Sequence, residues 1–256
     1  MPLTIVTVPC LSDNYAFLLH STKTGETAVI DAPEAAPIKA ALAEQGWQLS
    51  HILLTHHHDD HIDGVAALRG PGIKVIGATA DAARLPALDL SVSEGETFKF
   101  ADHNVQVFDV SGHTVGHIAF YIADAGAVFT GDSLMALGCG RLFEGSPDQM
   151  WASLSKLAAL PPEITVCSGH EYTAANARFA ITIEPNNDAL HTRIKAIDTA
   201  RAAGQPTVPS GLAEELATNP FLRVGLPAIK AHLDMTQQSD AAVFAEIRKR
   251  KDRFKN

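Results

Sequence analysis

Residues 55–61, Thr-His-His-His-Asp-Asp-His, constrain this chain more than any other stretch. They follow a short apolar run that is typical of a buried strand and precede residues 62–68, which indicate the start of a helix. In an extended segment His56 and His58 project to one side, while Asp60 and His61 lie past the bend. This one turn can therefore present ligands to two metal ions.

Three further apolar runs each end in a glycine followed by a potential ligand. His113 follows residues 105–110, Asp132 follows residues 127–130, and His170 follows residues 164–168. The glycines allow tight turns that would bring these side chains to a common rim. One ion would then be held by His56, His58 and His113, and another by Asp60, His61 and His170. Asp132 would bridge the two ions.

Imidazole and carboxylate ligands suit Zn, Fe or Mn, and each predicted ion keeps an open position, as catalytic sites require. We expect two divalent ions, zinc in first place. The alternatives are a low-specificity histidine tract or a metal-binding module without catalysis. We expect His57 to be structural and His117 to be packed rather than a ligand. Asp31 either orients a ligand histidine or caps the next turn.

The fold class is predicted as α/β, with two sheets packed together and helices outside. Up to about residue 170 the sequence indicates short strands separated by turns and a few helices, and beyond it mainly helices. The predicted domains are residues 1–170, which carry the ligands, and a smaller helical domain at residues 171–256. Helices are expected at residues 172–183, 188–203, 212–217 and 241–253.

Charge and cysteine content limit the possible partners. The net charge of −9 argues against nucleic acid, and no apolar run approaches the roughly 20 residues of a membrane helix. Three scattered cysteines form no disulfide framework and favour a reducing, cytoplasmic compartment. Residues 241–256 hold six basic and two acidic side chains, a net charge of +4, which suggests a small anionic ligand. A monomer is expected.

The order Thr-His-x-His-x-Asp-His, Gly-His, Gly-Asp and Gly-His resembles the metallo-β-lactamase superfamily. Four additional motifs resemble glyoxalase II, the hydroxyacylglutathione hydrolases. These are Gly-Cys-Gly-Arg-Leu-Phe-Glu-Gly at residues 138–145, Gly-His-Glu-Tyr-Thr at 169–173, Pro-Thr-Val-Pro-Ser at 206–210 and Asn-Pro-Phe at 219–221. The resemblance covers nearly the whole chain and implies an αββα sandwich followed by a helical domain that helps bind glutathione.

The resemblance also implies glutathione contacts and a reaction. The contacts fall on Arg141, Phe143, Tyr172, Arg248 and Lys251. Many members carry Lys in place of Arg141 and Tyr in place of Phe143, and the second change removes a hydroxyl donor. The implied reaction is hydrolysis of S-D-lactoylglutathione to glutathione and D-lactate by a hydroxide held between two metals, the second step of methylglyoxal detoxification. Asp60 and Asp132 are the predicted catalytic carboxylates.

Residue chemistry agrees with that expectation. On a helix Arg248, Lys251 and Lys255 share one face, which could hold the two carboxylates of glutathione, while Val243 and Ile247 pack inward. Each cation alone is equally well explained by the helix dipole. A thiolate leaves with little protonation, so the absence of an obvious general acid favours a thioester over an amide. The rival hypotheses are a glutathione persulfide dioxygenase with one iron and a lactonase or β-lactamase.

Overall fold

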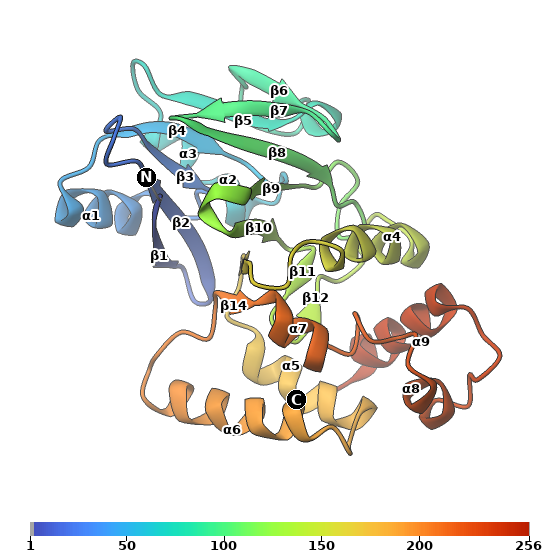
Figure 1. Ribbon diagram of the computed structural model, residues 1–256. Helices are drawn as coiled ribbons and strands as arrows, with labels where there is room; N and C mark the ends of the chain where they lie inside the picture. Colours follow the sequence, from blue (N-terminus) through green and yellow to red (C-terminus); the bar gives the residue numbers. More distant parts are fainter. Residues whose placement is uncertain (1–2, 256) are drawn as a thin grey trace. The chain divides into compact units, whose positions relative to one another are not determined.

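The computed structural model describes residues 3–255, which form two compact units. The first unit runs to Val110 and includes Val115–Gly131. The second contains Ser111–Thr114 and the chain from Asp132 onward. Figure 1 labels the elements of both. These units are groups of residues in mutual contact, so they do not test the domain boundary predicted at residue 170, which remains a prediction.

The first sheet of unit 1 has the strand order β1-β2-β3-β4-β5-β6. The pairs β1–β2 and β2–β3 are antiparallel, whereas the pairs from β3 to β6 are parallel. Parallel neighbours need a crossover: α1 connects β3 to β4, α2 and α3 connect β4 to β5, and a segment with a short 3-10 helix connects β5 to β6. The elements are β1 (Thr4–Cys10), β2 (Asn14–His20), β3 (Thr27–Ile30), α1 (Ala35–Gln45), β4 (Leu49–Leu53), α2 (Asp59–Ile62), α3 (Val65–Leu68), β5 (Lys74–Ala78) and β6 (Leu90–Val92).

Four strands of unit 1 form an antiparallel meander in the order β10-β9-β8-β7. They are β7 (Thr97–Phe100), β8 (His103–Asp109), β9 (Ile118–Ile122) and β10 (Ala127–Gly131). The meander faces the first sheet, since the rings of Phe17 and Phe129 lie 5.7 Å apart and those of His51 and Phe100 lie 5.4 Å apart. Apolar side chains between the sheets thus build the core of this unit.

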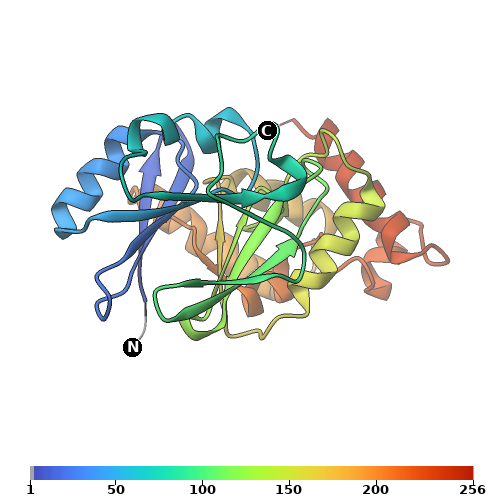
Figure 2. The ribbon, with the colours of Figure 1, turned by 90° about the horizontal axis from the view of Figure 1, so that it is seen from above.

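Helices cover the other face of the first sheet. Ile38 and Leu42 of α1 and Val65 of α3 pack into one buried cluster with Val29 and Ile52 of the strands. Figure 2 shows these helices, in blue and cyan, along one side of the blue strands. Helix, sheet and second sheet are three of the four layers expected of an αββα sandwich.

Unit 2 is mainly helical. Its elements are β11 (Leu134–Met135), β12 (Gly138–Cys139), α4 (Pro147–Ala158), β13 (Thr165–Ser168), α5 (Thr173–Ile183), α6 (Asp188–Ala202), β14 (Ser210–Gly211), α7 (Leu212–Thr218), α8 (Pro227–His232) and α9 (Asp240–Arg253). Side-chain caps begin three of the helices: Ser146 with Gln149 forms a capping box on α4, while Asn187 caps α6 and Ser239 caps α9. Buried Phe179 of α5 and Phe244 of α9 both pack against Phe221, which is also buried and lies in the loop between α7 and α8.

Most predicted strands and helices are present within a few residues of their expected ends. No expected element corresponds to α8 or to the strands β6, β11, β12 and β14, which have two or three residues each. The helix after the ligand turn was expected to start at residue 62. This start was wrong, because α2 begins at Asp59 and thus contains Asp60 and His61. The expected face of three cations was also wrong, because α9 ends at Arg253 and Lys255 lies beyond it.

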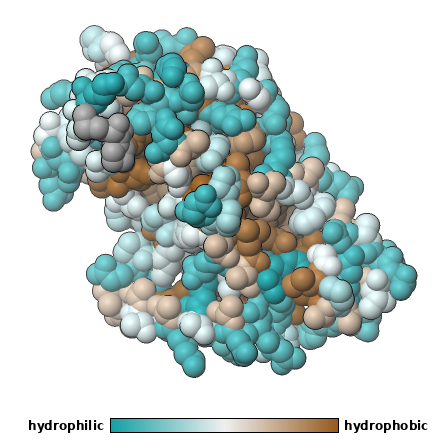
Figure 3. Space-filling view, viewed as in Figure 1, coloured by the Kyte–Doolittle hydropathy of each residue, from teal (hydrophilic) through white to brown (hydrophobic). Residues whose placement is uncertain are grey.

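The surface shown in Figure 3 is covered mainly by hydrophilic residues, in keeping with a charged, acidic protein. Within residues 3–255, every helix falls short of the length and apolar character that crossing a membrane requires.

A buried ion pair allows the packing of unit 2 to be tested. The carboxylate of Glu215 is fully buried, pairs with the buried guanidinium of Arg193 and accepts hydrogen bonds from Leu137 N at 2.8 Å and Asn219 Nδ2 at 3.1 Å. Glu215→Gln would remove the buried partner of Arg193 and leave only the half-exposed Glu214 beside the guanidinium, so we expect the free energy of unfolding to fall by about 3–5 kcal/mol. Denaturant unfolding measures it.

The neighbouring Glu214 is the matched control. Its side chain is 51% exposed and lies 3.2 Å from Arg193 Nε, so Glu214→Gln should cost at most about 1 kcal/mol. Equal losses in the two variants would contradict the assignment of stability to the buried pair.

Candidate metal centre

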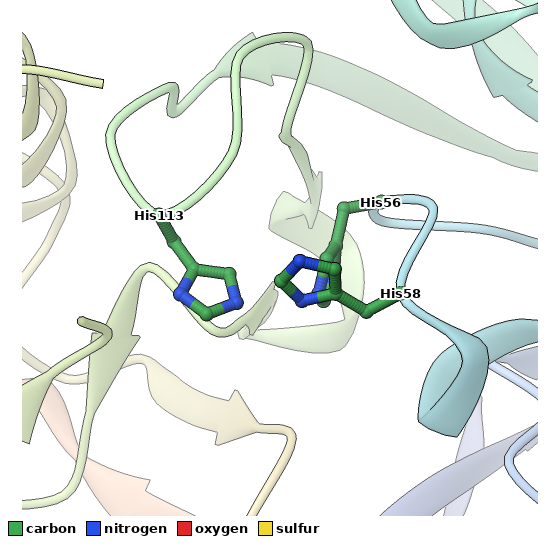
Figure 4. A group of neighbouring side chains, drawn as sticks. All are labelled: His56, His58 and His113. Atoms are coloured by element: carbon green, nitrogen blue, oxygen red, sulfur yellow. The ribbon is translucent and has the colours of Figure 1, made fainter. Parts of the chain in front are cut away.

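The segment between β4 and α2 brings four predicted ligands together. His56 and His61 are fully buried, while His58 and Asp60 are partly buried. His56 Nε2 lies 3.2 Å from His58 Nδ1, and the two rings lie beside each other in Figure 4, which also draws His113. The rings of His56 and His61 are 4.2 Å apart, and His61 Nε2 is 3.9 Å from Asp60 Oδ2. Such close, buried imidazoles with a carboxylate are the ligand set that Zn, Fe or Mn prefers.

Two side chains from other strands hold this segment. Asp31, just after β3, accepts hydrogen bonds at 2.8 Å from Thr55 N, Thr55 Oγ1 and His61 Nδ1. Asp31 therefore orients His61 so that Nε2 is the nitrogen left for a ligand bond, which decides between the two roles considered for it. Asn14, at the start of β2, donates from Nδ2 to Asp60 Oδ2 at 3.0 Å. The sequence contained no signal for Asn14, because it lies 46 residues from its partner.

Histidines 57 and 117 have partners in unit 1. The ring of His57 turns to Asp81, with Nδ1 at 2.9 Å from Oδ2. His117 is fully buried and stacks on His56, with ring centroids 4.5 Å apart and planes at 14°. The sequence did not single out Asp81.

In unit 2 the other three predicted ligands lie close to one another. His113 Nε2 is 3.5 Å and His170 Nε2 is 3.3 Å from Asp132 Oδ2. His113 Nδ1 donates to the carbonyl of Arg141 at 2.7 Å, so Nε2 of the neutral ring carries a lone pair directed at a carboxylate oxygen. Two acceptors facing each other repel unless a proton or a cation lies between them. The donor set therefore fits a metal ion.

The backbone of Gly140 allows this arrangement. A Cβ on Gly140 would lie 1.9 Å from the carbonyl oxygen of Asp132 and 3.0 Å from His113 Nδ1. Any side chain at this position would displace both ligands. The Gly-Cys-Gly-Arg motif thus has a direct physical role beside the site.

The predicted glutathione contacts are all in unit 2, and three of them touch its ligand histidines. Tyr172 stacks on His170, with centroids 4.6 Å apart and planes at 7°. Phe143 is 61% exposed and meets the ring of His113 at 5.2 Å. The carbonyl of Arg141 holds His113, as above. These aromatic side chains therefore border the ligands.

Arg248 and Lys251 lie deeper than a solvated helix end would place them. Arg248 is 6% exposed, donates from Nη1 to the carbonyl of Cys139 at 3.0 Å and pairs through Nη2 with Asp252 at 2.8 Å. Within residues 3–255, no acceptor binds its buried Nε. Arg141 Nε lies 3.6 Å from the same Asp252 carboxylate. Arg141, Asp252 and Arg248 thus form a connected cluster.

Lys251 is partly buried, and its ammonium lies over Phe179 at 5.3 Å and Phe254 at 5.7 Å. Burial, followed by the nearby cations Arg248 and Arg178, lowers the pKa of Lys251 to about 8. A cation in this surrounding gains from an anionic ligand, which would restore its preference for the charged form.

The cysteines do not take part in this chemistry. Burial raises the pKa of Cys10 and of Cys139 to about 11, and it raises that of Cys167 as well. Thiols with raised pKa values in buried positions are poor nucleophiles.

Comparison with known proteins identifies relatives along the whole chain. Residues 12–170 match the metallo-β-lactamase superfamily, and residues 171–254 match the hydroxyacylglutathione hydrolase C-terminus. A hydroxyacylglutathione hydrolase of Roseobacter denitrificans is 66% identical, and one of Ruegeria pomeroyi is 64% identical. Each alignment spans 255 residues, 99% of this chain and 100% of the relative.

Solved structures agree on the fold. ETHE1 from Myxococcus xanthus has a TM-score of 0.68 and 25% identity, covering 97% of this chain and 90% of that one. The BLEG-1 B3 metallo-β-lactamase has a TM-score of 0.65 and 22% identity, covering 86% and 99%. These structures confirm the predicted fold class. The match of residues 12–170 to the metallo-β-lactamase superfamily, together with the His and Asp clusters, gives the chain a metal-binding site. The chain belongs to the hydroxyacylglutathione hydrolase family of the metallo-β-lactamase superfamily.

Proposed function

We propose that this chain hydrolyses S-D-lactoylglutathione to glutathione and D-lactate, the second step of methylglyoxal detoxification. Full-length identity of 60–66% to hydroxyacylglutathione hydrolases supports the reaction. The structural observation that carries it is that the cluster of Arg141, Asp252 and Arg248 is connected to the candidate metal ligand His113. Arg141 holds His113 through its carbonyl and lies beside Asp252, which pairs with Arg248. Substrate anchoring and metal ligation thus meet at Arg141.

We propose that the metal centre takes two divalent ions, with zinc as the expected metal. His56, His58 and His113 would hold one, Asp60, His61 and His170 the other, with Asp132 as the shared ligand; these residues fall into the side-chain groups able to hold an ion. Chain connectivity supports this assignment. His113 lies in a four-residue loop that joins two segments of unit 1, and Asp132 directly follows Gly131 at the end of β10.

When bound, the metal ions would supply an activated water and polarise the thioester carbonyl. The chain's own residues prepare that chemistry. Asp31 and the Arg141 carbonyl set which nitrogen of His61 and His113 faces the centre, and Asn14 fixes Asp60. Asp60 and Asp132 are the proposed catalytic carboxylates. Because these contacts exist before substrate arrives, little reorganisation is needed during reaction.

The proposed substrate contacts divide by chemistry. Arg248 and Lys251 would bind the glutathione carboxylates, and the buried Nε of Arg248 offers a donor for them. Exposed Arg141 would add a further cation, while Phe143 and Tyr172 offer aromatic faces beside the reacting group. Phe143 can pack against the peptide but cannot donate a hydrogen bond. The leaving glutathione thiolate derives from a thiol with a pKa of about 8.5, so it departs without a dedicated general acid.

We further propose a monomer in the cytoplasm. The buried thiols of Cys10 and Cys139 would persist in a reducing compartment, and glutathione conjugates occur where the thiol pool is reduced.

Removal of metal tests the function directly. The purified protein should hydrolyse S-D-lactoylglutathione, lose this activity after treatment with a chelator and recover it with Zn²⁺, because the proposed reaction depends on a water activated by metal. Thioester absorbance gives the rate, and metal analysis gives the content. A metal-free protein that is as fast as the loaded one would refute the proposal.

The two buried cations separate glutathione recognition from metal binding. In an Arg248→Ala, Lys251→Ala double variant we expect KM for S-D-lactoylglutathione to rise at least about 10-fold, since each charged hydrogen bond contributes roughly 1.5–3 kcal/mol. Metal content should not change. The control is Lys249→Ala, Arg250→Ala on the exposed side of α9, with KM as in the wild type. An unchanged KM in the first variant would remove the glutathione assignment.

The lowered pKa of Lys251 predicts a pH dependence. Its ammonium is charged below a pKa of about 8 and loses its charge as pH rises through that value, so KM should increase on the alkaline side while kcat changes little. Lys251→Arg keeps its charge at these pH values and should flatten the profile. If the arginine variant shows the same alkaline rise in KM, Lys251 is not its source.

A further inference from the structure

A buried carboxylate outside the ligand set contacts the segment that carries His56 and His58. Asp81 ends a short 3-10 helix, η1 (Thr79–Asp81), after β5, and its side chain is fully buried. Asp81 Oδ2 accepts a hydrogen bond from His57 Nδ1 at 2.9 Å. Because His57 stands between the two ligands in sequence, this bond fixes the backbone from which both project.

The same carboxylate reaches a second segment through Arg84. Asp81 Oδ1 accepts from Arg84 Nε at 2.7 Å, and Arg84 Nη2 donates to the carbonyl of Val115 at 2.7 Å. The neighbouring backbone lies directly against the acid: a Cβ on Gly116 would come within 3.1 Å of the Asp81 carboxyl carbon, and φ there is +96°. Only glycine fits this approach without strain.

We propose that Asp81 is a positioning residue for the metal ligands, acting on two segments at once. Through His57 it holds the His56–His58 segment, and through Arg84 it holds Val115, two residues after His113 in the chain. These contacts lie within unit 1. The proposal rests on the metal assignment made under the proposed function. It extends that assignment to a carboxylate that touches none of the ligand atoms.

The electrostatics suit such a role. A buried carboxylate is costly unless it is paired, and the guanidinium of Arg84 compensates its charge. The remaining carboxylate oxygen can then accept the hydrogen bond from His57 Nδ1. Charge-assisted bonds of this kind are short and directional, and they keep a ligand backbone within the narrow limits that metal geometry demands.

If Asp81 served only to shape its own turn, Asp81→Asn would leave Zn²⁺ affinity unchanged. Its backbone carbonyl accepts hydrogen bonds from Arg84 N at 2.9 Å and Leu85 N at 3.0 Å, which shape the turn after η1. Asp81→Asn keeps those backbone bonds and the side-chain volume, and it removes only the negative charge and one acceptor.

Asp89, which directly precedes β6 and is 41% exposed, provides a control with similar contacts. Its Oδ2 accepts from Val75 N at 2.8 Å and from Arg69 Nη2 at 3.0 Å, so it too joins a strand to an arginine. Zn²⁺ affinity is measured on metal-free protein by competition with a chromophoric chelator. We expect Asp81→Asn to weaken binding of one Zn²⁺ by about 10–100-fold, the usual effect of removing a ligand's supporting partner, and Asp89→Asn to leave both affinities unchanged. Wild-type affinities in Asp81→Asn would overturn the proposal.

A second pair of variants keeps the proposal testable if Asp81→Asn does not fold. His57→Ala removes the donor to Asp81, whereas His57→Asn places a side-chain N–H close to the position of Nδ1. We expect weakened Zn²⁺ binding in the alanine variant and recovery in the asparagine variant. Equal affinities in the two would overturn the role of this hydrogen bond.

These measurements use no substrate, so they are separate from the test of the reaction. A wild-type protein that binds two Zn²⁺ ions but does not cleave S-D-lactoylglutathione would refute the proposed reaction and leave the role of Asp81 intact. A wild-type protein that binds no Zn²⁺ would overturn both.

Discussion

The hydrogen bonds that fix one nitrogen of each ligand imidazole are the interactions on which the remainder of the site depends. A neutral imidazole has one donor and one acceptor nitrogen, and the partner of the first determines where the second points. Asp31 makes this choice for His61, and the carbonyl of Arg141 makes it for His113. Without these partners the rings could rotate or exchange tautomers, and His61 and His113 would lack a defined acceptor direction.

The candidate ligands could be picked out from the sequence because they follow strands. Chain order places His113, Asp132 and His170 after apolar runs, and the glycines before them mark the turns, so the proximity of these three side chains in unit 2 follows from strand geometry. The supporting residues could not be predicted in this way. Asp31 lies 30 residues from His61, and Asp81 lies 24 from His57. Nothing in the local pattern around an aspartate tells which distant histidine it will meet.

Dependence on partners that are distant in the sequence also decided which helices and strands could be predicted. Long elements such as β2, α6 and α9 have enough residues for a hydrophobic period and a cap to be visible. Two-residue strands such as β11 and β14 have no period, since they exist only because a partner strand supplies hydrogen bonds. The helical pattern correctly placed Val243 and Ile247 inside and put Arg248 on a separate cationic face, but it did not show that this arginine would be buried. In the structure Arg248 is buried, and its Nη1 donates a hydrogen bond to the carbonyl of Cys139, 109 residues away.

Burial of that arginine changes how the two cations can act. A guanidinium stays charged even when it is desolvated, so Arg248 is a permanent cation anchored by Cys139 and Asp252. An ammonium in similar surroundings loses part of its preference for the proton, as the lowered pKa of Lys251 shows. Arg248 in turn contributes to that lowering, so the anchored cation makes its neighbour more dependent on an anionic ligand. Arg141 then links this cluster to the metal centre, because its side chain lies beside Asp252 while its carbonyl orients His113. A change that displaces the Arg141 backbone would therefore disturb the proposed substrate contacts and the candidate ligand His113 together.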